Sequence, residues 1–122
     1  PKQQKPRKID LRTVLIIQSD KEVLVEKRPN KGLLAGLWQL PSMDGHCDEK
    51  TVLSAAQKWG MDVLRIEPLP AAKHIFTHVQ WDMYGFYVEV SEPAGEYTWV
   101  SAAQLQAEFA LPTAFRQFLE VL

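Results

Sequence analysis

Four side chains in this sequence could bind a metal ion through nitrogen or sulfur. They are three histidines and one cysteine: His46, Cys47, His74 and His78. Structural zinc and iron–sulfur sites need about four nitrogen or sulfur ligands at suitable spacing. The histidines are irregularly spaced and no paired acids accompany them, while one cysteine supplies neither a four-cysteine site nor an internal disulfide. We therefore predict no metal centre, and a reducing compartment, the cytoplasm.

A hydroxyl, a ring and an imidazole stand together at Phe76, Thr77 and His78, shortly after Lys73. The threonine hydroxyl can donate and accept hydrogen bonds. Lys73 and Lys31 could contact phosphate, although surface lysines are usually only solvated. By themselves these residues favour a plain β-turn, with Phe76 in the core, His78 partly exposed and Thr77 bonded locally. A functional interpretation needs a wider pattern.

The composition is that of one folded domain, with 122 residues, 46% of them hydrophobic and 24% charged. Apolar runs such as Val14–Ile17 are too short to cross a membrane. The net charge of -1 is unevenly distributed, because residues 1–81 carry 13 Lys and Arg against 9 acids, whereas residues 82–122 carry 1 against 6. This asymmetry can be an ordinary feature of a solvated surface. Alternatively, one face built from the N-terminal two-thirds of the chain approaches phosphate groups. We expect a monomer with no membrane contact.

The chain opens with a basic segment, residues 1–8, that reads as a linker and suggests that other sequence precedes it. Residues 9–122 form the expected domain. Strands are predicted at 9–18, 22–28, 37–40, 63–69 (weak), 73–76, 79–90 and 97–100. A loop is expected at 42–47. Helices are predicted from the caps Asp48, Ser101 and Thr113, over 48–59, 101–109 and 114–122.

This order of elements favours a mixed α/β (α+β) sandwich over a regular alternation of strands and helices. The predicted buried residues of the long strand are Trp81, Met83, Phe86 and Val88. Trp38 is expected to be a core residue rather than a ligand.

Several motifs together resemble the Nudix (MutT-like) fold, a mixed sheet sandwiched between helices. In the run Gly32–Pro41 (GLLAGLWQLP), two glycines bracket a loop that leads into a tryptophan-bearing strand. A loop and a helix that ends in Trp59-Gly60-Met61 follow, and much later Trp99–Ser101 opens another helix.

The Nudix signature places an Arg-Glu and a Glu-Glu pair on that helix, where the carboxylates hold magnesium. Here the corresponding positions hold Leu53, Ser54, Gln57 and Lys58, and Ser42 and Met43 replace the preceding glycine pair. The remaining nearby acids look like capping and solvated residues: Asp44, Asp48 and Glu49. The resemblance therefore implies the fold without its catalysis.

A narrower resemblance extends over residues 9–122 and is to the C-terminal domain of A/G-specific adenine DNA glycosylases, the MutY family. It rests on Gly32–Pro41 and on Phe76-Thr77-His78, where the family has Phe-Ser-His. The resemblance implies that Thr77 takes the place of the serine that contacts 8-oxoguanine. Oxidation turns N7 of guanine into a donor and adds an acceptor at C8, and one hydroxyl can pair with both.

The same resemblance implies that Phe76, Thr77 and His78 contact DNA or 8-oxoguanine. With Lys73 and Lys31 as candidate phosphate contacts, they make up the predicted binding site. The partners would be double-stranded DNA containing 8-oxoguanine opposite adenine, and an N-terminal catalytic domain of the same protein. That domain would carry the iron–sulfur cluster and the catalytic acids, so this chain would hold no cofactor and no catalytic residue. Two alternatives remain open: a Nudix hydrolase with an aberrant metal site, and a protein-interaction module on a non-catalytic Nudix scaffold.

We predict that the chain does not hydrolyse nucleoside diphosphate derivatives with magnesium or manganese, because residues 53, 54, 57 and 58 offer no carboxylate. Release of phosphate and of nucleotide monophosphate measures this. Metal-dependent turnover at enzyme-like rates, abolished by mutation of this helix, would contradict the prediction.

Overall fold

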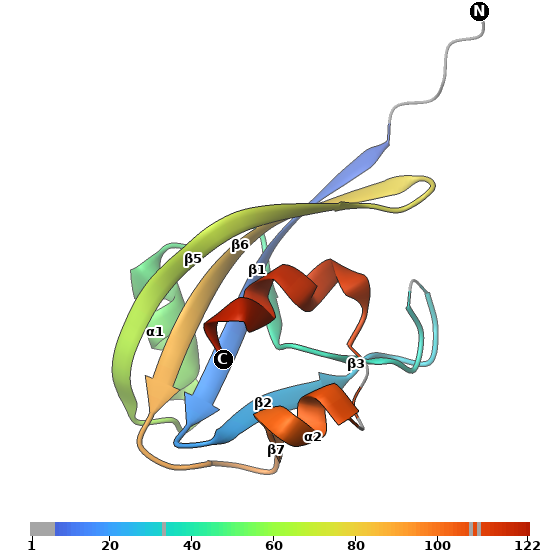
Figure 1. Ribbon diagram of the computed structural model, residues 1–122. Helices are drawn as coiled ribbons and strands as arrows, with labels where there is room; N and C mark the ends of the chain where they lie inside the picture. The colour runs from blue at the N-terminus through green and yellow to red at the C-terminus, as the bar shows by residue number, and fades with distance from the viewer. Residues whose placement is uncertain (1–6, 33, 108, 110) are drawn as a thin grey trace, which may run out of the picture.

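The computed structural model describes residues 7–32, 34–107, 109 and 111–122 (Figure 1). Most of the expected linker (1–6), residue 33 of the glycine-bracketed run and residue 108 of a predicted helix lie outside this part. The elements in chain order are β1 (Lys8–Ser19), β2 (Glu22–Lys27), β3 (Trp38–Gln39), β4 (Ser42–Asp44), α1 (Glu49–Lys58), β5 (Val63–Ile75), β6 (Val79–Val90), β7 (Thr98–Ser101), α2 (Ala102–Ala107) and the 3-10 helix η1 (Thr113–Val121).

One mixed sheet organises the chain, with the strand order β3-β2-β1-β6-β5. Two short strands lie off this path, since β4 pairs with β1 and β7 pairs with β2. The central pair β1 and β6 is parallel and runs from Lys8 opposite Val79 to Gln18 opposite Glu89. The start of the domain therefore lies beside the hairpin that joins β5 to β6.

Residues 13–17 of β1 are buried on both faces of the sheet, which explains the continuous apolar run Val14–Ile17. Val14 and Ile16 belong to the core cluster that contains the buried residues of η1. Leu15 and Ile17 point to the opposite face and pack with the buried residues of α1. Figure 1 shows η1 in front of the sheet and α1 behind it. The expected sandwich of a mixed sheet between helices is thus confirmed.

The predicted strand interior is also confirmed. Trp81 and Met83 face the η1 side, whereas Phe86 and Val88 face the α1 side, and all four are buried. Trp38 is a packing residue as expected, since its ring meets that of Phe109 edge-on at 4.9 Å between centroids.

The predicted break after residue 69 is wrong, because residues 63–75 form one strand, β5. Pro68 and Pro70 led to the expectation of an interruption, since proline cannot donate to a sheet ladder. However, β5 is an edge strand of the main path, and a register shift between Leu69 and Ala72 absorbs the irregularity. The result is one long, curved strand that leads directly to the candidate tripeptide (Figure 1).

Other boundaries differ more modestly. Residues 42–44, predicted as loop, form β4 against β1, and Lys8, assigned to the linker, already belongs to β1. Asp48 caps α1 as predicted, accepting a hydrogen bond from the Thr51 amide at 2.8 Å, and α2 ends at Ala107. The last helix is 3-10 rather than α, and Pro112, not Thr113, is its N-terminal flank.

Gly85 of β6 allows η1 to approach the sheet closely. A Cβ atom at this position would overlap with the ring of Phe118 and would lie 3.3 Å from the Leu69 Cβ atom. The Phe118 side chain is itself buried, so its ring has little room to move aside.

We expect Gly85→Ala to lower the free energy of unfolding by about 1–3 kcal/mol, the usual effect of overpacking a core. Urea unfolding measures the change. In a Phe118→Ala background the same substitution should cost much less, because the overlapping ring is gone. An equal cost in both backgrounds would contradict this account.

Candidate functional site

The tripeptide singled out in the sequence occupies the tip of the β5–β6 hairpin. The amide of Phe76 donates to the carbonyl of Val79 at 2.7 Å, which leaves Thr77 and His78 as a two-residue loop. Both loop residues are exposed, as is Lys73 farther down β5. In Figure 1 this tip, drawn in yellow, extends beyond the helices that cover the sheet.

The first strand supports this tip. The amide of Lys8 donates to the carbonyl of His78 at 3.1 Å. The Thr77 side chain makes no hydrogen bond to another residue in the described part of the chain, so the local bond expected of a plain turn is not found there. Its hydroxyl is available to a ligand.

Phe76 points inward and packs against other rings. Its ring lies 4.7 Å from that of His74 and 4.9 Å from that of Trp81, both edge-on, measured between centroids. The structure therefore separates the tripeptide into an anchoring residue, Phe76, and two presented residues, Thr77 and His78.

Trp81 lies beneath this anchor and also contacts two arginines. The guanidinium carbons of Arg12 and Arg28 lie 4.3 and 5.2 Å from the Trp81 ring centroid. An ion pair of 3.1 Å joins Arg12 to Asp10. Sequence reasoning missed both arginines. The alternation of Asp10 and Arg12 along a strand was a weak signal that they share one face.

Lys31 lies apart from this group, exposed in the loop that joins β2 to β3. Its neighbour Leu34 packs against the same core cluster as Phe76, so both loops border one core. Within the described residues, however, no hydrogen bond or ion pair connects Lys31 to the hairpin. The structure brings Phe76, Thr77 and His78 together at the tip, while Lys73 lies farther down β5, opposite Asp82.

Glu26, Gln39 and Arg28 form a polar row near the edge of the sheet. The buried Gln39 amide donates to Glu26 at 2.8 Å and accepts from Arg28 at 2.6 Å. Burial raises the pKa of Glu26, opposed by the hydrogen bond from Gln39 and by the charge of Arg28. Burial and then the charge of Arg12 lower the pKa of Arg28, whereas Glu26 and Asp10 act in the opposite direction.

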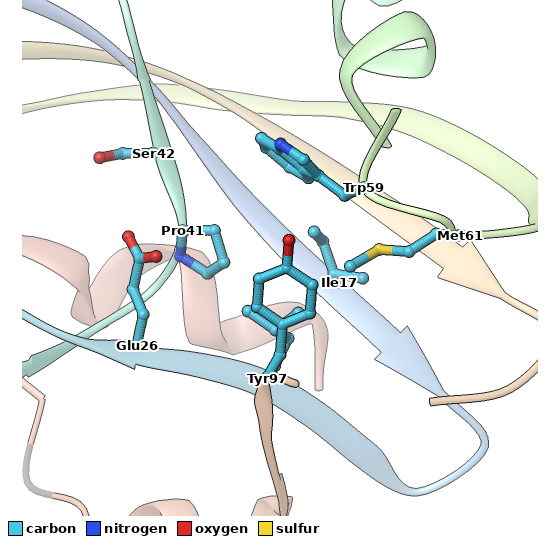
Figure 2. A pocket seen from close by; sticks show the side chains of 8 residues that line it. Ile17, Glu26, Pro41, Ser42, Trp59, Met61 and Tyr97 are labelled. Carbon is cyan, nitrogen blue, oxygen red and sulfur yellow. The ribbon is translucent and has the colours of Figure 1, made fainter. Parts of the chain in front are cut away.

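A pocket of about 160 Å³ lies on the other face of the sheet, beside the C-terminal end of α1 (Figure 2). Apolar residues of β1 and β2 line it together with Trp59, Tyr97, Ser42 and Glu26. Figure 2 shows the Tyr97 hydroxyl directed toward the Trp59 ring and the Glu26 carboxylate beside Pro41. Glu26 is the one carboxylate among the lining residues.

The α1 positions considered for metal binding are mostly on the surface. Ser54, Gln57 and Lys58 are exposed, and Leu53 is partly buried. Asp48 serves as the helix cap, and the hydrogen bonds from Thr51 lower its pKa. No group of three histidine, cysteine or acidic side chains in the described ranges is arranged to hold a metal ion.

The histidines lie in separate settings. His46 stacks on Tyr84 with 3.8 Å between ring centroids, and its Nε2 atom is 3.0 Å from the Asp82 carbonyl oxygen. His74 packs on Phe76, and His78 is at the exposed tip.

Comparison with known proteins gives a consistent picture. A family model described as the NUDIX domain matches residues 12–121. The adenine DNA glycosylase of Homo sapiens is 30% identical over 111 residues, which cover 82% of this chain and 20% of the relative. That of Rattus norvegicus is 28% identical over 113 residues, covering 80% and 22%. The chain thus spans about a fifth of the length of these curated relatives.

Solved structures show the same fold. The C-terminal domain of mouse MUTYH, in a complex with human PCNA, superposes with a TM-score of 0.70 at 20% identity, covering 92% of this chain and 88% of that one. A MutT protein from Staphylococcus aureus has a TM-score of 0.67 at 16% identity, covering 94% and 95%.

The helices of the described residues include none long and apolar enough to cross a membrane.

The raised pKa of Glu26 predicts a pH dependence of stability. The folded protein keeps this proton to a higher pH than the unfolded chain, so the unfolding free energy should fall as pH rises from the ordinary carboxyl pKa through the raised value. Glu26→Gln has no such proton and should lose less stability over that window.

Urea unfolding at a series of pH values measures the difference between the two proteins. Glu22→Gln is the matched control, because it removes an exposed acid from the same strand. Parallel pH profiles of the unfolding free energy for the wild type and Glu26→Gln would show that burial does not raise the pKa of the Glu26 carboxyl.

Proposed function

This chain belongs to the NUDIX domain family, and we propose that it is the DNA-binding domain of an adenine DNA glycosylase, which recognises 8-oxoguanine opposite adenine in base-excision repair. The proposal rests on the likeness to adenine DNA glycosylases over four-fifths of the chain. It also rests on one structural observation, the exposed Thr77 hydroxyl at the tip of the β5–β6 hairpin.

The hydroxyl of Thr77 has the chemistry that the oxidised base requires. At ring positions 7 and 8, 8-oxoguanine presents an N–H donor and an acceptor oxygen. At the same two positions guanine has an acceptor nitrogen and a C–H group. A hydroxyl can accept from the N–H donor and donate to the acceptor oxygen. The narrow tip of the hairpin can approach a base edge. His78 at the tip and Lys73 farther down β5 are both exposed for contacts to the DNA backbone.

The domain itself is proposed to be non-catalytic. The α1 positions that hold metal-binding carboxylates in Nudix enzymes carry Leu53, Ser54, Gln57 and Lys58, and a lysine repels a divalent cation. Excision of adenine would therefore be carried out by an N-terminal catalytic domain, and the iron–sulfur cluster would be held there. This chain would supply recognition of the damaged base.

A protein-binding role is a second candidate, because the similar domain of mouse MUTYH was crystallised in a complex with human PCNA. The two functions are compatible. A domain that presents one hairpin tip to DNA leaves most of its surface available to a protein partner.

We predict that Thr77→Val lowers the preference for 8-oxoguanine over guanine, both opposite adenine, by about 1–3 kcal/mol, the range for one specific base contact. Valine keeps the shape of threonine but cannot pair with the base edge. Titration of labelled duplexes at low salt measures the two affinities, since phosphate contacts weaken steeply as salt rises.

Thr77→Ser is the matched control, because it keeps the hydroxyl and loses only a methyl group. It should retain the wild-type preference. A Thr77→Val protein with an unchanged ratio would remove Thr77 from the recognition of the base.

A further inference from the structure

We propose that Phe76 and Trp81 are positioning residues for Thr77, and that their ring contact holds the two-residue loop in the conformation that presents the hydroxyl. This inference rests on the proposed function, since it concerns how the same hairpin tip recognises a base. It adds a role to Trp81 and Arg12, which the sequence did not associate with the tip.

The loop lacks the residues that would fix a tight hairpin by themselves. Two-residue hairpin loops favour type I′ or II′ turns, which need a positive φ and therefore glycine, asparagine or aspartate. Asp20 and Leu34 are the only non-glycine residues with positive φ in the described ranges, so Thr77 and His78 both have negative φ. Thr77 is also β-branched and resists positive φ. Contacts outside the loop must therefore select its conformation.

Two backbone hydrogen bonds close the loop but do not depend on its side chains. They are the bonds from the Phe76 amide to Val79 and from the Lys8 amide to His78. The Phe76 ring is the side-chain anchor, half-buried against His74 and Trp81. Phe76 directly precedes Thr77, so anchoring its ring against Trp81 also restricts the backbone from which Thr77 is presented.

Trp81 is a firm support for the anchor. Its side chain is 1% exposed. The guanidinium of Arg12 lies 4.3 Å from its ring centroid, and Asp10 holds that guanidinium in place. The Phe115 ring of η1 packs against Trp81 at 5.8 Å between centroids.

The sheet register sets this arrangement. Trp81 pairs with Asp10 on β1 and with His74 on β5. Arg12 lies two residues beyond Asp10, and Phe76 two residues beyond His74, so Arg12, Trp81 and Phe76 form a diagonal row on one face. The row connects the exposed tip to the core beneath η1.

Preordering the tip should increase discrimination, because a loop that is already fixed loses less entropy when it binds. We therefore expect Phe76→Leu, which keeps apolar bulk but removes the ring, to loosen Thr77. The preference for 8-oxoguanine over guanine should fall roughly 3- to 10-fold, the cost of ordering a side chain and its loop on binding. Affinity for the undamaged duplex should change little.

The methyl resonance of Thr77 reports the same effect in the 122-residue chain without DNA. In Phe76→Leu it should shift toward its value in an unfolded peptide or broaden through exchange. Phe76→Tyr keeps the ring and should restore the wild-type resonance and preference.

Phe86→Leu is the matched control, because it removes a buried ring of the same strand, β6, from the opposite face of the sheet. It should lower the free energy of unfolding at least as much as Phe76→Leu. The Thr77 resonance and the base preference should nevertheless stay at their wild-type values.

The outcomes separate positioning from the proposed function. An unchanged Thr77 resonance in Phe76→Leu overturns positioning, even if the base preference falls, because Phe76 would then act on DNA directly. Equal effects of Phe86→Leu and Phe76→Leu on the resonance also overturn it. A wild-type chain without any preference for 8-oxoguanine contradicts the proposed function, while the resonance still tests positioning.

Discussion

The parallel pairing of β1 with β6 is the constraint on which the rest of the structure depends. It places an apolar strand, buried on both faces, at the centre of the sheet, and both faces then need a cover. The helix α1 supplies one cover and η1 the other. The same pairing carries β1 out to the hairpin tip, where Lys8 meets His78 and Arg12 meets Trp81.

The helix α1 and the 3-10 helix η1 cover the sheet with different numbers of buried side chains. Only Val52 and Ala56 of α1 are buried, whereas Ser54, Gln57 and Lys58 face solvent. Residues at solvent-facing positions can change with little effect on the free energy of unfolding. By contrast, η1 is fixed through Phe115 and Phe118, and Gly85 gives it room. Three of the four α1 positions considered for metal binding therefore contribute little to the packing of the fold.

Much of the fold could be predicted because short-range rules apply to it. Alternation identified the buried residues of β6, and the caps Asp48 and Ser101 marked the starts of two helices. The errors arose where tertiary context prevailed. Pro68 and Pro70 fit an edge strand that the sequence alone could not locate at an edge, and residues 42–44 became a strand only because β1 offered a free edge.

The candidate site was predictable only in part. Phe76, Thr77 and His78 were found through a family resemblance, because their local pattern is that of an ordinary turn. The contact between Arg12 and Trp81 joins residues 69 positions apart and follows from strand register, which no local pattern encodes. Sequence reasoning therefore located the tip but not the row of side chains beneath it.

The hydrogen bond between Lys8 and His78 also determines the place at which the chain enters the sheet. Anything joined to the chain ahead of residue 8 starts from the end of the sheet that carries Thr77. A domain joined there would emerge beside the hairpin tip rather than at the opposite end of the sheet. A ligand at the tip would then lie beside both parts of such a chain, with no need for a strong contact between them.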